Sequence, residues 1–218
     1  MTDTLRHYPA LVTGASRGLG FALAEEIGAR GTHVIAVART VGGLEDLDDA
    51  ITGKGGSATL APMDVTNAEA MEHLAKMVGA RWGGLSLWVH AAVHAAPLAP
   101  AGHIDAKDFA KSVAGNITAT ATLIPLIEPL LRAGGGTALF LDDACAGRKF
   151  FGSYGATKAA QIALARSWAA ENERIGPRVV IAAPAPMPTA TRARFFPGED
   201  RGALADPRSE AKRLLDGL

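Results

Sequence analysis

The sequence predicts an α/β protein in three layers, with a doubly wound parallel sheet of about six strands between two layers of helices. Short apolar runs alternate with helical segments along most of the 218 residues, which is typical of parallel strands joined by right-handed crossovers. Most positions in these runs are apolar, as expected for strands that are buried on both faces. We expect one domain over residues 1–218, with residues 189–218 as a substrate loop and C-terminal tail.

The expected strands are short apolar runs, each followed by a turn or loop. In chain order they are Ala10–Val12, His33–Ala38, Ala58–Met63, Leu85–Ala91, Thr137–Leu141 and Arg178–Ala183. The expected helices have apolar residues at helical spacing. They lie around Phe21–Gly28, Leu44–Ile51, Asn67–Ala80, Ala106–Ala133 in two pieces, Tyr154–Asn172 and Glu210–Leu215. No seventh strand is expected, because proline and glycine residues interrupt the chain after residue 189.

Composition and charge indicate a small-molecule partner. The 22 basic and 22 acidic residues balance and form no long block of one sign, so we expect neither nucleic acid nor a membrane as partner. We find no apolar stretch of roughly 18 residues and no export leader. The single cysteine, Cys145, cannot form an internal disulfide. Together these features favour a soluble, cytoplasmic protein.

The segment TGASRGLG, residues 13–20, joins the first strand to the first helix. Bare amides at a helix amino terminus hold diphosphates, so the turn favours a dinucleotide site; the alternative is an ordinary tight turn. NAD sites usually have an acidic residue after the second strand that hydrogen-bonds the ribose hydroxyls; here Ala38 and Arg39 occupy that place. Arg39 and Arg17 suit a 2′-phosphate. The prediction is NADP(H) in preference to NAD(H), and the alternative is that both arginines are surface charges.

Tyr154 and Lys158 in SYGATKAA have the i, i+4 spacing that places two side chains on one face of a helix. A nearby ammonium favours the phenolate, so we expect the pKa of Tyr154 to fall from about 10 toward neutrality. Tyr154 can then exchange a proton with a carbonyl or alcohol oxygen while a cofactor carries the hydride. The alternative is a buried aromatic ring beside a solvated lysine.

Four motifs in register, TGASRGLG, MDVT at residues 63–66, Asn116 and Tyr154-x-x-x-Lys158, resemble the short-chain dehydrogenase/reductase family over residues 8–190. The resemblance implies a Rossmann-type domain with Tyr154 as the acid/base, Lys158 as its electrostatic partner and Asn116 as support for a relay water. The cofactor residues that it implies are Gly14, Ser16, Arg17, Gly18, Leu19, Gly20, Arg39, Asp64, Val65, His90, Ala91, Tyr154, Lys158, Pro184, Met187 and Thr189. It also implies a homo-oligomer, with a dimer favoured over a tetramer because the seventh strand is missing.

Three segments depart from the family pattern. The N-N-A-G that follows the fourth strand reads HAAV here, residues 90–93, and the P-G after the sixth strand reads Pro184-Ala185. At the end of the fifth strand, two serines of the family align with Asp142 and Asp143. His90 and His94 have the spacing of a helical zinc pair, but they lie on a strand and a loop, so no metal site is expected.

Asp143 aligns with the serine that donates a hydrogen bond to the substrate oxygen in the family. An ionised carboxylate has no proton to donate, and its charge opposes the negative charge that a carbonyl oxygen gains during reduction. The alternatives are a protonated Asp143, a substrate that donates to it, or a shifted alignment with Ala144 or Cys145 in that place. We expect an NADP(H)-dependent oxidoreductase acting on a carbonyl or secondary alcohol, with a non-catalytic NADP(H)-binding protein as the rival.

Overall fold

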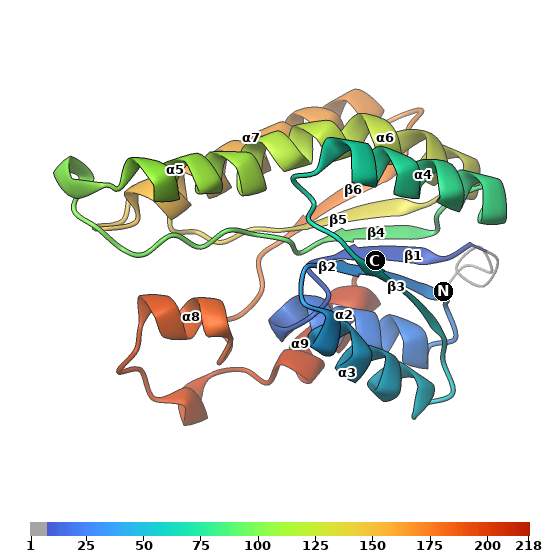
Figure 1. The fold of residues 1–218 in the computed structure, drawn as a ribbon, viewed down its shortest axis with the longest axis horizontal. Helices are drawn as coiled ribbons and strands as arrows, with labels where there is room; N and C mark the ends of the chain where they lie inside the picture. The colour runs from blue at the N-terminus through green and yellow to red at the C-terminus, as the bar shows by residue number, and fades with distance from the viewer. Residues whose placement is uncertain (1–7) are drawn as a thin grey trace.

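The computed structural model describes residues 8–218 (Figure 1). Residues 1–7, which the predicted domain includes, lie outside the described residues. The described residues form a sheet of six parallel strands in the order β3-β2-β1-β4-β5-β6. Helices cover both faces of this sheet (Figure 1). The predicted three-layer α/β fold is therefore confirmed.

The strands lie where the apolar runs predict them, with differences at their ends. They are β1 (Ala10–Thr13), β2 (Val34–Ala38), β3 (Ala58–Pro62), β4 (Leu87–His90), β5 (Thr137–Leu141) and β6 (Arg178–Ala182). The predicted run for β4 begins earlier, at Leu85. The amide of Leu85 donates to the carbonyl of Leu130, the amide of Ser86 donates to the carbonyl of Pro9, and the residue pairing with β1 begins at Leu87.

The two faces of the sheet carry separate apolar cores. One face is covered by α2 (Gly18–Ala29), α3 (Val41–Thr52) and α9 (Pro207–Asp216), and the other by α4 (Ala68–Trp82), α5 (Ala106–Ser112), α6 (Ala119–Gly134) and α7 (Gly152–Asn172) (Figure 1). Val12 belongs to the core beside α2, whereas its neighbour Leu11 belongs to the core that contains Trp88. Successive strand residues point to opposite faces, which is why most positions in the strands are apolar.

A long helical segment precedes β5. It consists of α5 and α6, joined by a π-helical segment, Val113–Thr118, where the prediction has a helix in two pieces. By length and composition alone, Ala106–Gly134 would be able to cross a membrane, which corrects the expectation that no stretch is long and apolar enough. Leu123, Ile127 and Leu131 of this segment are buried in the core over the sheet. Core helices of globular proteins share this composition.

The carboxyl ends of the strands bring distant segments to one edge. Because β1 lies between β2 and β4, the strand order reverses at β1, and ligands of such sheets bind at this switch point. The glycine turn follows β1, Ala91 follows β4, Asp142 follows β5 and Ala183 follows β6. Helix α8 (Ala190–Phe195), which the sequence pattern does not predict, stands apart from the sheet (Figure 1).

Candidate active site

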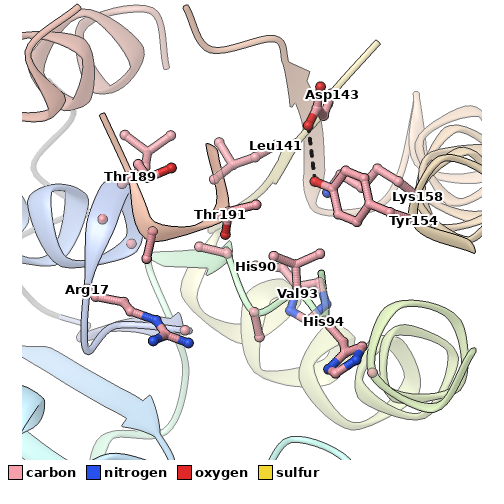
Figure 2. A pocket seen from close by; sticks show the side chains of 18 of the residues that line it. Arg17, His90, Val93, His94, Leu141, Asp143, Tyr154, Lys158, Thr189 and Thr191 are labelled. Carbon is pink, nitrogen blue, oxygen red and sulfur yellow. Dashed lines mark hydrogen bonds between the residues drawn. The ribbon is translucent and has the colours of Figure 1, made fainter. Parts of the chain in front are cut away.

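A cleft of about 820 Å³ lies at the carboxyl ends of the strands. Figure 2 shows Tyr154 and Lys158 on one side of it and Arg17 and Thr189 on the other. The predicted site residues that line the cleft are Gly14, Ser16, Arg17, Gly18, Leu19, Gly20, Arg39, Asp64, Val65, His90, Ala91, Asp143, Tyr154, Lys158, Pro184, Met187 and Thr189. Asn116 is completely buried behind this lining.

The glycine turn packs closely against the end of β4. Gly14 has a φ of 80°, and a Cβ on it would lie 2.6 Å from the amide nitrogen of Ala92. A Cβ on Gly20 would lie 2.3 Å from the carbonyl oxygen of Gly14. Larger residues would therefore displace the turn. Since α2 begins within the cleft lining at Gly18, its free amides and positive dipole end form a cradle that fits the phosphates of a dinucleotide.

Two arginines add positive charge to this part of the cleft. The side chain of Arg39 is 62% exposed, and its guanidinium lies 3.6 Å from the carboxylate of Asp64. Asp64 also accepts hydrogen bonds from the amide and hydroxyl of Thr66 at 3.0 and 2.9 Å. Burial acts to raise the pKa of Asp64, but these bonds and Arg39 outweigh it and lower the pKa. Arg17 and Arg39 both line the cleft, so a 2′-phosphate fits the donors that are present.

Tyr154 faces a carboxylate. Its hydroxyl donates a hydrogen bond to Oδ2 of Asp143 at 3.1 Å (Figure 2). Burial, followed by the negative charge of Asp143, raises the pKa of Tyr154 above its ordinary value. The predicted fall of this pKa toward neutrality is therefore wrong. A carboxylate from the end of β5 contacts the phenol, whereas the ammonium of Lys158 bonds elsewhere.

Lys158 lies one turn after Tyr154 on α7 and is 5% exposed. Its ammonium donates to Oε1 of Gln161 at 2.6 Å. Burial lowers the pKa of Lys158 to about 8, although the charges of Asp143 and Asp142 act in the opposite direction. Lys158 is therefore mostly protonated at neutral pH and loses its charge as the pH rises through about 8.

Asn116 joins the segment after β4 to α7. Its Oδ1 accepts from the amide of His94 at 2.7 Å, and its Nδ2 donates to the His94 carbonyl at 3.0 Å and to Oγ1 of Thr157 at 2.9 Å. Asn116 lies on the π-helical segment, a feature frequent at functional sites. Because both the oxygen and the nitrogen of its amide are hydrogen-bonded to protein groups, Asn116 holds the segment after β4 and helix α7 together at one wall of the cleft.

His90 is 1% exposed and neutral. Its Nδ1 lies 2.8 Å from Oγ1 of Thr13, and its Nε2 lies 3.0 Å from Oγ1 of Thr120. Burial, followed by the charge of Lys158, lowers the pKa of His90 to about 3. Since both ring nitrogens bond to threonines, neither is free to bind a metal together with His94.

Aromatic residues complete the wall beside Tyr154. The ring centroids of Tyr154 and Phe195 are 4.9 Å apart, and those of Phe151 and Phe195 are 5.1 Å apart. Cys145 is buried in this cluster, and burial followed by the charge of Asp143 raises its pKa to about 12. The contact between Asp143 and Tyr154 therefore favours Asp143 over Cys145 in the serine position. The pair Phe150-Phe151, shortly before Tyr154 in the sequence, is one signal of this wall, and the second pair, Phe195-Phe196, is the signal that the sequence reasoning missed.

The fold and the cleft define the class of Rossmann-type dinucleotide-binding proteins, because a glycine turn and a helix amino terminus lie at the switch point of a parallel sheet. Within that class, the chain belongs to the short-chain dehydrogenase family, whose family model matches residues 9–200. The resemblance read from the four motifs is thereby confirmed.

Relatives of known sequence carry reductase names. A tropinone reductase homologue of Arabidopsis thaliana is 33% identical over 178 residues, covering 78% of this chain and 66% of that protein. A fatty acyl-CoA reductase of Acinetobacter baylyi is 31% identical over 166 residues, covering 74% of this chain and 56% of that protein. This chain therefore spans less than two thirds of the length of these two relatives.

Solved structures align over nearly the whole chain. A short-chain dehydrogenase from Pseudomonas syringae has a TM-score of 0.88 and 28% identity, covering 96% of this chain and 87% of that one. A short-chain dehydrogenase from Shigella flexneri, complexed with NADP, has a TM-score of 0.88 and 26% identity, covering 95% of this chain and 89% of that one.

Proposed function

We propose that this chain is an NADP(H)-dependent oxidoreductase that transfers hydride between the nicotinamide and a carbonyl or secondary alcohol. The observation that carries the proposal is the buried pair Tyr154 and Lys158 in the same cleft as the glycine turn. Membership of a dehydrogenase family supports the reaction class. The NADP complex of the Shigella flexneri relative supports the choice of cofactor.

The proposal assigns a role to each predicted site residue. The bound cofactor supplies or accepts the hydride. Tyr154 transfers the proton at the substrate oxygen, and Lys158 places a positive charge nearby. Asn116 holds the wall between β4 and α7, and Asp143 contacts the substrate beside Tyr154. The predicted cofactor residues that line the cleft hold the dinucleotide between the glycine turn and α7.

The test is NADPH consumption by the purified protein with a panel of ketones, aldehydes and quinones, with NADPH binding measured separately by fluorescence. Turnover with a member of the panel supports the enzyme. Tight NADPH binding without turnover supports a non-catalytic NADP(H)-binding protein, a rival that the hydrogen bond from Tyr154 to Asp143 favours. A protein that binds no nicotinamide cofactor contradicts both.

Replacing Arg39 with alanine is expected to raise the KM for NADPH at least about tenfold, because the 2′-phosphate loses a charge-assisted hydrogen bond. The KM for NADH should stay unchanged, since that cofactor has a hydroxyl in this place. Steady-state kinetics with both cofactors measure the effect. Arg174→Ala removes an equal charge from an exposed position beyond the end of α7, and it should change neither KM.

Reduction is expected to slow as the pH rises through about 8, the pKa to which burial lowers Lys158. Below this pH the ammonium is present; above it, the fraction of charged lysine falls about tenfold per pH unit. The measurement is kcat/KM for the carbonyl substrate between about pH 6 and pH 10. Lys158→Arg remains charged over this range, so its residual activity should show no such decline. A wild-type profile that stays flat above pH 9 would contradict the role of Lys158.

We propose that residues 189–218 are the substrate loop and tail of a single domain over residues 1–218. In support, α8 brings Phe195 against Tyr154. The carboxylate of Glu210 in α9 accepts a hydrogen bond from the amide of Ala185, a cleft residue, at 2.8 Å. The aromatic wall favours a substrate with an apolar body next to its carbonyl or hydroxyl group.

We also propose that the protein acts as a homodimer in the cytoplasm. The family resemblance supports pairing through the long helices α6 and α7, and the described sheet has no seventh strand for a second interface. Sedimentation velocity measures the oligomeric state, and a tetramer would contradict the proposed dimer.

A further inference from the structure

A connected set of buried polar side chains runs from Lys158 into the core. We call Gln161, Thr120, His90 and Thr13 the buried polar chain. Gln161 Oε1 accepts from Lys158 at 2.6 Å, and Gln161 Nε2 donates to Thr120 Oγ1 at 3.0 Å. His90 then bonds to Thr120 at 3.0 Å and to Thr13 at 2.8 Å. All four side chains are at most 1% exposed.

The buried polar chain has one consistent arrangement at its Lys158 end. An ammonium only donates, so Gln161 must direct its oxygen to Lys158 and its amide nitrogen to Thr120. Thr120 accepts this bond, its hydroxyl donates to the carbonyl of Asn116 at 2.9 Å, and its oxygen also lies 3.0 Å from Nε2 of His90. Because the Thr120 proton goes to the Asn116 carbonyl, neutral His90 donates from Nε2 to Thr120 and accepts at Nδ1 from the Thr13 hydroxyl. The amide of Gln161 therefore cannot flip without leaving buried polar groups unpaired, which is costly.

Of the polar groups around the Lys158 ammonium, Gln161 is the one that forms a hydrogen bond with it among the contacts of the described residues. The charged or titratable groups that act on Lys158 are Asp142 and Asp143 from the end of β5, Cys145 from the following loop and His90 from β4, with Tyr154 one turn earlier on α7. Neither carboxylate forms a hydrogen bond with the ammonium among the contacts of the described residues, whereas Gln161 does. The amide oxygen thus holds a charge that burial disfavours.

We propose that Gln161 is a positioning residue for Lys158, holding its ammonium protonated and in one place beside Tyr154, and that Thr120 and His90 in turn hold Gln161. The catalytic meaning of this contact rests on the proposed function. The contact itself is a property of the folded protein and is testable without turnover.

The first experiment measures the titration of Lys158 by NMR of lysine labelled at Nζ with ¹⁵N, assigned by loss of the signal in Lys158→Met. Gln161→Met has similar length, but its thioether is only a weak acceptor, so Lys158 should titrate about one pH unit or more below wild type. Gln161→Glu places a carboxylate there and should move the titration upward. An unchanged titration in both variants, with NADPH binding retained, would overturn the proposal.

The second experiment removes the hydrogen bond between Gln161 and Thr120, the next bond of the buried polar chain after that to Lys158. Thr120→Val keeps the shape but removes the hydroxyl that orients Gln161, so Lys158 should again titrate lower, by less than in Gln161→Met. Thr120→Ser restores the hydroxyl and should restore the wild-type titration. Should Gln161→Met fail to fold, Gln161→Glu together with Thr120→Val and Thr120→Ser still tests whether Gln161 positions Lys158. An equal titration in Thr120→Val and Thr120→Ser contradicts the orienting role of Thr120.

Kinetics connect the inference to the proposed function. The decline of kcat/KM with pH should move to lower pH in Gln161→Met and return toward wild type in Thr120→Ser. If the titration of Lys158 moves as expected but the wild-type protein turns over no substrate, the proposed function fails and the positioning of Lys158 stands. If turnover is present but its pH dependence does not follow the titration of Lys158, the positioning role fails and the oxidoreductase stands.

Discussion

Tyr154→Phe is expected to lower the turnover of NADPH with a carbonyl substrate by about a thousandfold, within the range of roughly 10²- to 10⁴-fold that a general acid contributes. Phenylalanine lacks the hydroxyl that transfers the proton, but it keeps the ring that packs against Phe195. The aromatic wall should therefore stay in place, and NADPH should still bind. Single-turnover kinetics and fluorescence titration measure the two effects separately.

The matched control is Tyr8→Phe, since Tyr8 is the other of the two tyrosines in the sequence. It makes the same chemical change outside the cleft and should leave turnover unchanged. If Tyr154→Phe keeps a wild-type rate, the proton comes from another group, and the role proposed for Tyr154 is wrong.

Asp143→Ser should raise the rate of ketone reduction. The carboxylate accepts the hydrogen bond that the Tyr154 hydroxyl would donate to the substrate oxygen, and its charge opposes the negative charge that grows on the carbonyl oxygen. Two like charges about 4 Å apart repel by about 4 kcal/mol at an effective dielectric of about 20, which corresponds to about a thousandfold in rate. Asp143 is exposed, so water weakens this repulsion. We expect a rise of about ten- to a hundredfold in kcat/KM.

Asp142→Ser is the control for the loss of one negative charge. Asp142 accepts from the amide of Asp143 at 2.8 Å and lies 3.5 Å from Arg166, without a hydrogen bond to Tyr154. Its effect on reduction should be smaller than that of Asp143→Ser. A flat or lower rate in Asp143→Ser would indicate that the carboxylate binds a donor group of the natural substrate.

A spectroscopic measurement isolates the effect of Asp143 on Tyr154. Burial and Asp143 both raise the pKa of Tyr154, so removal of the carboxylate should let the phenol ionise at lower pH. The ultraviolet absorbance of the phenolate reports this titration in a Tyr8→Phe background, where Tyr154 is the remaining tyrosine. An unchanged titration in Asp143→Ser would show that burial alone sets this pKa.

Much of the fold is predictable because its signals are local. A strand buried on both faces is apolar at most positions, and Thr137–Leu141 has the same bounds in the prediction and in the structure. The glycine turn is readable because its backbone packing excludes side chains at Gly14 and Gly20. Helix α8 has only six residues, too few for a periodic pattern. It is held by the Thr189 side chain, which accepts from the amide of Arg192 at 3.2 Å, and by the packing of Phe195.

The partners of the site residues are harder to predict. The i, i+4 spacing places Lys158 on the helix face of Tyr154, yet the ammonium bonds to Gln161 and the phenol bonds to Asp143. For this reason the direction of the Tyr154 pKa shift was opposite to the prediction. The polar amide at Gln161, three residues after Lys158, is visible in the sequence, but Thr120, its bonding partner, lies on another helix.

The sequence by itself determined the sheet, the cofactor turn and the positions of Tyr154, Lys158 and Asp143. Each of these leaves a signal in residues that are near one another in the sequence: apolar runs for buried strands, i, i+4 spacing for a helix face, and glycines where two backbone segments pack closely. Only the tertiary structure decided which of these groups form hydrogen bonds with each other and which shift each other's pKa. Hydrogen bonds such as that between Tyr154 and Asp143 act over about 3 Å, and distances of that size between separate elements are set by the packing of the whole sheet and its helices.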